Sequence, residues 1–546
     1  MKQYIKSILL AFILCLTVYS RLSAQEKPPA NWFNLDEQQD GIRGVSTERA
    51  YRELLKDKQP KRVVIVGVID SGVDIQHEDL QTKLWKNTKE KAGNKKDDDK
   101  NGYIDDIDGW NFIGGKDGRN IKQDNLEVTR EYVRLSKLYK DKKESDFSGK
   151  KLEEYKYYLK VKEDFESKLK EAKQNLFGFK FFYMEYTSNV KILKKYLNKP
   201  ETAFLTEQEV KAIGDSVSSE IKEARNQFLN VAQLGLDEEG MKEYMEYLEN
   251  KVKYSYNPDF DPRKEIVGDD YDNLKEKGYG NNDVIGTDAK HGTHVAGIIA
   301  SNRDNEIGIK GVANSVLIMP IRAVPDGDER DKDIANAIRY AVDNGANIIN
   351  MSFGKGYSPH KAIVDEAVKY AESKNVLLVH AAGNEALNLD ESPNFPNRRY
   401  ANSTQQAENW IEVGASSWGN EDNFVGSFSN YGKTTVDVFA PGVDIYSTIP
   451  NQKYKNESGT SMAAPVTSGV AALIMAYYPE FSAKEVKEII LKSAVRYPNK
   501  KINKPKEGEA KNKEYTTLDQ LCITGGIVNA YEALKLAEQM SKNKKK

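Results

Sequence analysis

One stretch constrains the fold of this chain more than any other, the continuous apolar run from Val63 to Ile69, which ends at Asp70. Such a run predicts a strand buried on both faces, the kind found in parallel sheets. Ligands of parallel α/β sheets gather at the carboxyl ends of the strands. The run therefore predicts an α/β sheet with Asp70 at its functional edge. The plainer interpretation of Asp70 is a turn residue at the end of a strand.

Further strands and helices alternate along the second half of the chain. Val316 to Ile321 and Ala346 to Met351 are apolar runs typical of buried strands, and Asp333 to Asn344 between them has a helical pattern. This alternation predicts a doubly wound, mainly parallel α/β sheet.

Two motifs place a histidine and a serine among small residues. His291 opens His-Gly-Thr-His-Val-Ala-Gly, and Val295 to Ala300 after it predicts a buried helix. Ser461 lies in Gly-Thr-Ser-Met-Ala-Ala-Pro-Val, which predicts a helix with Pro465 in its first turn. Free N–H groups and the positive dipole end at a helix N-terminus favour a developing oxyanion beside such a serine. The alternative is a serine that only caps its helix.

The second histidine of the motif raises a metal alternative. His294 lies three residues after His291 and would share a helix face with it, as zinc ligands do. No glutamate stands between them, so we favour a catalytic role for His291 alone.

In chain order, the aspartate, histidine and serine motifs resemble those of the subtilase (subtilisin-like) family of serine peptidases, over roughly residues 61–115 and 280–535. The resemblance implies a subtilisin-type fold and a serine endopeptidase that hydrolyses protein or peptide substrates. It makes Ser461 the nucleophile, His291 the general base and Asp70 the residue that orients the imidazole. It also makes Asn384, in Ala-Gly-Asn-Glu, the oxyanion-hole side chain, with a turn asparagine as the alternative.

The resemblance also implies a substrate cleft lined by main chain. Two segments that follow apolar strands would pair with an extended substrate. They comprise Ser352, Phe353 and Gly354 in the first segment and Ala381, Ala382 and Gly383 in the second.

An acidic segment after the first strand has the spacing of a calcium loop. The expected ligand positions are Asp97, Asp99, Asn101, Tyr103, Asp105 and Asp108. Asp108 stands where a longer glutamate is usual and no clear helices flank the segment, so a solvated acidic turn is the alternative.

A second calcium loop follows from the family resemblance alone. The stretch Asn302 to Val312 resembles the subtilase loop that holds a structural calcium, with a metal-free loop as the alternative. The expected ligands are Asp79, Asn305, Ile307 and Ile309, the last two through their carbonyl groups. Calcium would be structural, and no cofactor is expected for the chemistry.

Between the aspartate and histidine motifs the composition shifts to lysine, glutamate and tyrosine, which predicts an inserted α-helical subdomain. Helices are expected at Leu152–Leu169, Lys180–Tyr196, Glu207–Val231 and Glu238–Val252. The insertion is expected to be a decoration with its own core, and a lid or substrate exosite is the alternative. The predicted organisation is a signal peptide (1–24), an N-terminal segment (25–60), a discontinuous catalytic domain (61–115 and 276–535), the helical insertion (116–275) and a basic tail (536–546).

The N-terminus predicts export. Residues 1–24 combine Lys2 and Lys6, an apolar stretch and a small-residue cleavage site, which favours a periplasmic, cell-surface or secreted location with no stable membrane span after cleavage. Removal of the signal leaves Cys522 as the only cysteine, so no intrachain disulfide is expected. Residues 25–60 are short for the chaperone-like propeptide of subtilases, so they are expected to pack on the catalytic domain or be trimmed.

The overall charge excludes some classes of partner. The 546 residues carry a net charge of only −2, so neither a nucleic-acid-binding field nor a strongly acidic tail is indicated. Protein or peptide substrates are the expected partners, and the sequence leaves the oligomeric state open. Two rival hypotheses are a catalytically silent subtilase fold used as a binding scaffold and a helical insertion that serves adhesion as its main function.

Overall fold

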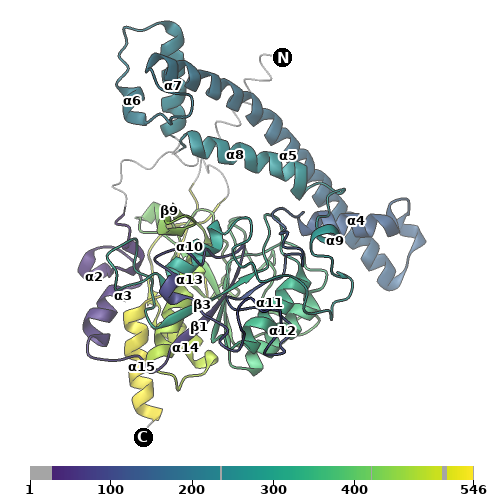
Figure 1. Ribbon diagram of the computed structural model, residues 1–546, viewed down its shortest axis with the longest axis vertical. Helices are drawn as coiled ribbons and strands as arrows, with labels where there is room; N and C mark the ends of the chain where they lie inside the picture. The colour runs from purple at the N-terminus through teal and green to yellow at the C-terminus, as the bar shows by residue number, and fades with distance from the viewer. Residues whose placement is uncertain (1–27, 234–235, 420, 507–512, 545–546) are drawn as a thin grey trace. The chain divides into compact units, whose positions relative to one another are not determined.

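The computed structural model describes residues 28–233, 236–419, 421–506 and 513–544 (Figure 1). The expected signal peptide lies outside the described residues. The described chain divides into two compact units, of which one comprises residues 128–233 and 236–260 and the other the remaining described residues. The first unit is narrower than the expected insertion of 116–275, because residues 116–127 and 261–275 belong to the second unit.

A nine-stranded sheet forms the centre of the second unit within the described residues. Its order is β10 (Val495–Arg496), β13 (Gly526–Ile527), β7 (Val438–Pro441), β6 (Trp410–Ser416), β5 (Leu377–Ala381), β4 (Ile348–Met351), β1 (Val64–Asp70), β3 (Val316–Arg322) and β2 (Trp110–Asn111). Only the β10–β13 pair is antiparallel. The predicted doubly wound, mainly parallel α/β fold is therefore confirmed.

Helices cover both faces of this sheet, and the side chains of each strand alternate between them. In β1, Val64, Val66 and Val68 pack on one face with α10 (Lys290–Ala300), α13 (Thr460–Tyr477), α14 (Ala483–Ser493) and α15 (Ala530–Lys544). Ile69 packs on the other face with α11 (Asp331–Asp343) and α12 (Lys361–Ser373). Burial on both faces explains why the strands are apolar throughout.

The N-terminal segment is part of this core. It contains 3-10 helix η2 (Trp32–Asn34), α2 (Glu37–Asp40), α3 (Thr47–Arg49) and a π-helix (Ala50–Leu55). Trp32 and Phe33 are fully buried, and the Trp32 indole N–H donates to the Asp444 carbonyl (3.0 Å). The Val45 carbonyl accepts the N–H of Ala530 (2.7 Å), at the start of α15. The segment therefore packs as an integral layer of the second unit.

The helical unit has its own hydrophobic core. Its helices are α4 (Glu127–Tyr139), α5 (Gly149–Tyr196), α6 (Glu207–Lys211), α7 (Ser219–Gln233) and α8 (Glu238–Asn250), of which α4 begins one residue before the unit. Phe179, Tyr186 and Leu193 of α5 pack with residues of α6, α7 and α8. The two expected helices at Leu152–Leu169 and Lys180–Tyr196 are a single helix, because the residues between them are mostly good helix formers and a lone Gly178 costs only about 1 kcal/mol.

Smaller elements complete the described chain. They are α9 (Arg263–Ile266), the strand pairs β8 (Ile445–Ile449) with β9 (Lys453–Glu457) and β11 (Ile502–Asn503) with β12 (Tyr515–Thr516), the 3-10 helices Gln81–Lys83, Glu144–Asp146, Glu421–Asn423 and Leu518–Gln520, and a second π-helix, Lys251–Ser255. Cys522 is a buried free thiol.

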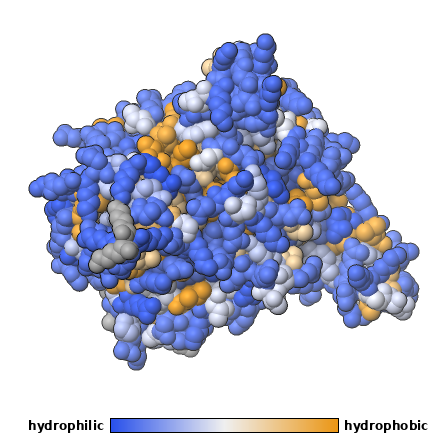
Figure 2. Space-filling view, turned by 90° about the horizontal axis from the view of Figure 1, so that it is seen from below, coloured by the Kyte–Doolittle hydropathy of each residue, from blue (hydrophilic) through white to orange (hydrophobic). Residues whose placement is uncertain are grey.

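One described helix, α13, is long and apolar enough to cross a membrane, but 94% of its 18-residue window is buried inside the protein. It is the core helix that carries Ser461. The face in Figure 2 is mainly hydrophilic, with small separate hydrophobic patches such as any folded protein exposes.

Candidate active site

Asp70 ends β1 at the carboxyl edge of the sheet, as predicted. Its side chain is almost fully buried, and Oδ1 accepts the N–H of Ser71 (2.8 Å). Its carbonyl accepts the N–H groups of Ala323 (3.0 Å) and Val324 (3.2 Å), which follow β3. Both the main chain and the side chain of Asp70 are therefore held in place.

His291 is the second residue of α10, and its Nδ1 lies 2.7 Å from Asp70 Oδ1. This close approach depends on Gly292, since a Cβ there would stand 2.2 Å from the Gly72 carbonyl oxygen. Burial acts to lower the pKa of the His291 imidazole, but the charge of Asp70 and the hydrogen bond to it outweigh burial and raise the pKa above 6.5. The arrangement orients the ring and favours its protonated form.

Ser461 is the second residue of α13, with its side chain partly accessible. Its hydroxyl donates to the Ser352 carbonyl (3.2 Å), and its own carbonyl accepts the Ser352 hydroxyl (2.9 Å). Pro465 stands in the second turn of the helix rather than in the predicted first turn. Because proline has no N–H, the Ser461 carbonyl four residues earlier loses its helical partner, and the Ser352 hydroxyl replaces that partner.

Asn384 lies beside the start of α13. Its side-chain oxygen accepts the Thr460 N–H (2.9 Å) and hydroxyl (3.0 Å). A Cβ on Gly459 would lie 3.6 Å from Asn384 Nδ2, so the amide nitrogen is near the segment that leads into Ser461. Because the oxygen is fixed by Thr460, the NH2 group is oriented as a donor.

The two expected substrate-binding segments follow adjacent parallel strands. Ser352, Phe353 and Gly354 come directly after β4, and Ala382 and Gly383 follow Ala381 at the end of β5, with Met351 in register with His380. The second segment is fixed by hydrogen bonds from Asn430 Nδ2 to the Ala382 carbonyl (2.9 Å) and from the Gly383 N–H to Thr460 Oγ1 (3.0 Å). Both segments therefore lie at the edge that carries Asp70.

His294 has a different environment from His291. Its Nε2 lies 3.0 Å from the Lys455 carbonyl oxygen, and burial lowers its pKa to about 4. The two histidines therefore have separate partners, as the catalytic interpretation of His291 alone requires.

The acidic segment between β1 and β2 carries the six positions of the predicted calcium loop, and their side chains make local hydrogen bonds. Asp97 accepts the N–H groups of Asn101 and Gly102, Asp105 those of Asn94 and Lys95, and Asp108 pairs with Lys86. Asn101 Oδ1 accepts the Tyr103 N–H, and the Tyr103 ring is buried. Asp97 Oδ1 and Asp99 Oδ1 both accept the Asn101 N–H (3.0 and 3.1 Å), and Asp99 also offers an oxygen within 4.8 Å of oxygens of Glu90 and Asp106. The spacing did not identify these two residues.

The second predicted calcium loop places Asn305 against Asp79. Asn305 Nδ2 donates to Asp79 Oδ1 (2.9 Å), and Asn305 Oδ1 is buried without a hydrogen-bond partner among the described residues. Asp79 is fully buried and also accepts the Asn302 N–H (3.1 Å). Ile309 is buried, whereas Ile307 is exposed.

Some contacts of the site have no signal in the sequence. Ser468 Oγ donates to Asn350 Oδ1 (2.9 Å), and Asn350 Nδ2 donates to Ser352 Oγ (2.9 Å), which bonds the Ser461 carbonyl. This chain joins β4 to α13. The sequence analysis used Ser352 only for its main chain, because pairing between distant hydroxyl and amide groups requires the fold.

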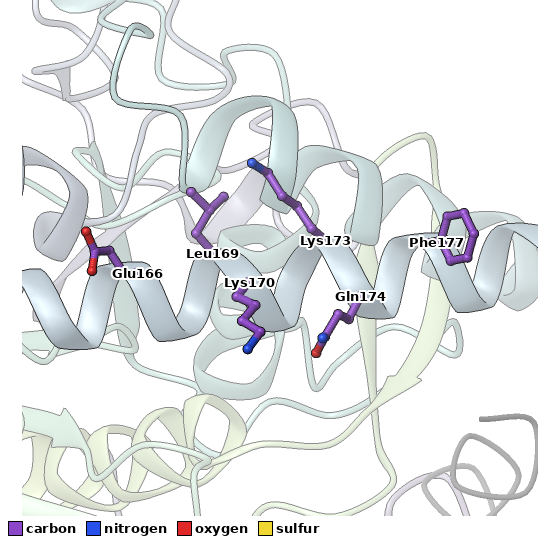
Figure 3. Close-up of a pocket in the computed structure, with 6 residues that line it drawn as sticks. All are labelled: Glu166, Leu169, Lys170, Lys173, Gln174 and Phe177. Carbon is purple, nitrogen blue, oxygen red and sulfur yellow. The ribbon is translucent and has the colours of Figure 1, made fainter. Parts of the chain in front are cut away.

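A separate surface hollow lies on α5 and is lined by Glu166, Leu169, Lys170, Lys173, Gln174 and Phe177 (Figure 3). All six side chains come from one helix, with Leu169 and Lys173 on one side of it and Lys170 and Gln174 on the other. None of the six is a paired nucleophile and base, so the hollow has no catalytic set.

The fold and the site define a doubly wound α/β protein with aspartate, histidine and serine motifs at one sheet edge. A model of the subtilase family matches residues 61–522, and the chain belongs to this family.

Individual relatives match over shorter stretches. The chain is 45% identical over 185 residues to the thermophilic serine proteinase of Bacillus sp. (strain AK1), covering 34% of this chain and 42% of the relative. It is 37% identical over 205 residues to subtilisin BL of Lederbergia lenta, and the match covers 37% of this chain and 70% of that relative. It is 35% identical over 216 residues to the cell wall-associated protease of Bacillus subtilis (strain 168), and the match covers 39% of this chain and 22% of that relative. The chain thus spans less than half the length of the first and last of these relatives.

Proposed function

We propose that this protein is an exported serine endopeptidase that hydrolyses peptide bonds of protein substrates. The observation that carries the proposal is the 2.7 Å contact between His291 Nδ1 and Asp70, at the sheet edge where Ser461 begins the core helix. Membership of the subtilase family supports the same activity.

In the proposed reaction Ser461 Oγ attacks the carbonyl carbon of the scissile peptide. His291 takes the hydroxyl proton as general base and then donates it to the leaving amine as general acid. Asp70 fixes the imidazole tautomer and stabilises the imidazolium that forms. Because the Ser461 hydroxyl donates to Ser352 in this conformation, it must rotate before it transfers its proton to His291.

The oxyanion of the tetrahedral intermediate is proposed to accept hydrogen bonds from Asn384 Nδ2 and from the Ser461 N–H. The anchored side-chain oxygen of Asn384 supports this role, since a fixed donor needs no reorganisation as charge develops. Loss of such a donor costs about a hundred- to a thousand-fold in kcat.

The substrate is proposed to bind as an added strand. The main chain at Ser352–Gly354 and Ala381–Gly383 would line the cleft in which this strand pairs, which favours an extended protein or peptide segment.

Export is proposed from the charged and apolar pattern of residues 1–24. The name of one matched relative, a cell wall-associated protease, is in keeping with a location outside the cytoplasm.

A structural calcium ion is proposed at Asp79 and Asn305. Asp79 supplies a buried carboxylate, and the buried Asn305 Oδ1 that no described group satisfies is the atom that such an ion would bind. The carbonyl groups of Ile307 and Ile309 would complete its oxygen ligands. The ion would stabilise the loop and take no part in the chemistry.

The test of the activity is covalent labelling followed by peptide profiling. A fluorophosphonate should label wild-type protein at Ser461 and leave the folded Ser461→Ala variant unlabelled. Only the wild type should cleave a library of proteome-derived peptides. A folded wild type that is neither labelled nor active would overturn the proposal and support a silent scaffold.

A further inference from the structure

A buried lysine comes directly after the first of the two expected substrate-binding segments. Lys355 follows Ser352–Gly354, and its side chain is 1% exposed. Its ammonium group contacts three oxygens, which are Glu127 Oε2 (2.7 Å), Asp331 Oδ1 (2.8 Å) and the carbonyl of Glu329 (2.8 Å). A buried charge is costly unless it is paired, so these contacts define the position of the lysine closely.

The two carboxylates that pair with Lys355 are buried and begin two different helices. Glu127 is the first residue of α4, and its N–H donates to Asp328 Oδ2 (2.8 Å). Asp331 is the first residue of α11, and its Oδ2 accepts the N–H of His360 (2.8 Å). Lys355 therefore joins the chain that follows β4 to the starts of α4 and α11.

The expected substrate-binding segment has a separate attachment at each end. At one end, the Ser352 hydroxyl donates to the Ser461 carbonyl (2.9 Å). At the other end, the N–H of Lys355 donates to the Phe395 carbonyl (2.9 Å), and the Lys355 carbonyl accepts the Phe395 N–H (2.9 Å). The side chain of Lys355 strengthens the second attachment, whereas the first depends on Ser352.

The groups around the ammonium are acidic. Burial raises the pKa of the Glu329 carboxyl, and the charges of Asp328 and Asp331 raise it further, whereas the charge of Lys355 lowers it. Without the ammonium, the carboxylates of Glu127 and Asp331 would repel each other at the place where the segment ends. We therefore expect the loss of this charge to displace the end of the segment.

We propose that Lys355 is a positioning residue, which holds the Gly354 end of the substrate-binding segment where an extended substrate pairs with it. The inference rests on the proposed peptidase function. Because the ammonium group contacts Glu127, Asp331 and the Glu329 carbonyl, Lys355 acts through the main chain of the segment. Glu127 is also the last residue before the helical unit, so the same ion pair connects the substrate-binding segment to the point where that unit begins.

The two attachments predict a specific division of kinetic effects. In Lys355→Met the Ser352 end stays bonded to Ser461, whereas the Gly354 end is released. KM for extended peptide substrates should rise about tenfold or more, with kcat changed by less than about threefold, since binding is lost and the reacting groups stay in place. A small fluorophosphonate does not extend along the segment, so its rate of labelling at Ser461 should stay within about threefold of the parent rate.

The matched control is Lys332→Met, which removes another fully buried lysine. Lys332 also contacts three oxygens, which are Asp269 Oδ2 (2.7 Å), Glu276 Oε2 (2.8 Å) and the carbonyl of Asp270 (2.7 Å). None of these partners belongs to the substrate-binding segment. Lys332→Met should therefore lower the free energy of unfolding as Lys355→Met does and leave KM at the parent value.

A parent KM in folded Lys355→Met would overturn the positioning role, and so would an equal rise of KM in Lys332→Met. Should Lys355→Met fail to fold, Glu127→Ala decides, because it removes one partner and leaves the ammonium two. Its KM should rise about threefold or more at nearly constant kcat, and an unchanged KM would overturn the role. Absence of fluorophosphonate labelling in the folded parent would instead overturn the proposed function, and the positioning role with it.

Discussion

At the scale of single residues, the site is organised around the carbonyl of Ser461. Pro465 deprives that carbonyl of its helical hydrogen bond, and Ser352 supplies another (2.9 Å) from the next layer of the fold. Asn350 and Ser468 extend the connection into the core. The position of the proposed nucleophile therefore depends on a short hydrogen-bonded chain as well as on its own helix.

Removal of the Ser352 hydroxyl should disturb the nucleophile and destabilise the fold. In Ser352→Ala the partly buried Ser461 carbonyl loses its partner, which should lower the free energy of unfolding by about 1 kcal/mol. We expect kcat to fall by more than KM rises, because the reacting residue moves while the substrate-binding main chain stays. Thr467→Ala, which removes another buried hydroxyl from α13, should affect stability without this loss of kcat. An unchanged kcat in Ser352→Ala would contradict the positioning role.

The pKa of His291 predicts the pH dependence. Burial opposes protonation of the imidazole, but Asp70 outweighs it and raises the pKa above 6.5. A general base must be neutral to accept a proton, so kcat/KM should rise with pH through this elevated pKa. Asp70→Asn removes the influence that raises the pKa, and the midpoint should shift to lower pH while the rate falls. A midpoint that Asp70→Asn leaves in place would exclude this coupling.

The raised pKa of His291 has the opposite effect on folding stability, which should fall as the pH rises. Because the folded pKa exceeds the unfolded one, the His291–Asp70 interaction stabilises the protein below the unfolded pKa, and this contribution is lost as pH rises through the folded pKa. Urea unfolding at a series of pH values around the His291 pKa checks this. The free energy of unfolding should fall with rising pH in Ser461→Ala, and this fall should be smaller in the Asp70→Asn and Ser461→Ala double variant.

At the scale of elements, the N-terminal segment behaves as a structural layer. Trp32 and Phe33 belong to the same buried cluster as β1, α13 and α15. A segment that was trimmed after folding would expose that part of the core. We therefore expect the active protein to keep this layer.

Truncation of one side chain in this layer should destabilise the whole unit. Trp32→Ala removes a fully buried ring and its hydrogen bond to Asp444, and should cost about 3–5 kcal/mol of unfolding free energy. Gln38→Ala, at an exposed position of α2, should change it by less than about 0.5 kcal/mol. Urea unfolding of both variants in the Ser461→Ala protein makes the comparison. Equal stability of the two would mean that the segment is a detachable appendage.

The sequence predicted some elements better than others, for physical reasons. The buried strands and the helix of Ser461 follow from continuous apolar runs, which burial on both faces of a sheet imposes. The group of carboxylates formed by Glu90, Asp99 and Asp106 was not predicted from the sequence. Irregular turns bring Glu90 and Asp106 together, and such turns leave no periodic pattern of residues in the sequence. The sequence analysis predicted two helices where α5 is a single one. The apolar pattern is interrupted near Gly178, but one glycine does not end a helix when the residues on both sides of it favour helix.

At the scale of the whole molecule, the junctions of the helical unit are secured within the catalytic unit. Arg330 contacts Asp124, before the helical unit begins, through Nε (2.9 Å) and Nη2 (3.0 Å). Its Nη2 also lies 3.3 Å from Asp261 Oδ1, just after the helical unit ends. The buried guanidinium of Arg330 therefore contacts a residue next to each end of the insertion.

Deletion of the helical unit should leave a folded peptidase. In a variant with residues 128–260 replaced by a short glycine-serine linker, we expect cooperative unfolding and kcat/KM for short peptides within about threefold of the parent. The reason is that none of the proposed catalytic residues lies in the unit and Arg330 holds the two ends. The same deletion with Arg330→Met should be less stable.

The deletion also separates two roles of the insertion. Loss of activity on folded protein substrates alone would favour an exosite, and equal activity on both substrate types would favour a decoration. Failure of the linker variant to fold, with a folded parent, would contradict the independence of the two units.

The apolarity of α13 has a consequence for a chain that crosses a membrane before it folds, as the proposed export requires. In the finished protein its window, with a mean hydropathy of 1.3, is enclosed by the core. During translocation the same stretch has no core around it, and its choice between lipid and the aqueous channel depends on its composition. Thr467, Ser468 and Gly469 make the stretch less apolar than an unbroken run of large aliphatic residues. Under the proposed export, we expect the small and hydroxylated residues that allow close packing around the proposed nucleophile also to favour passage of the nascent chain through the aqueous channel.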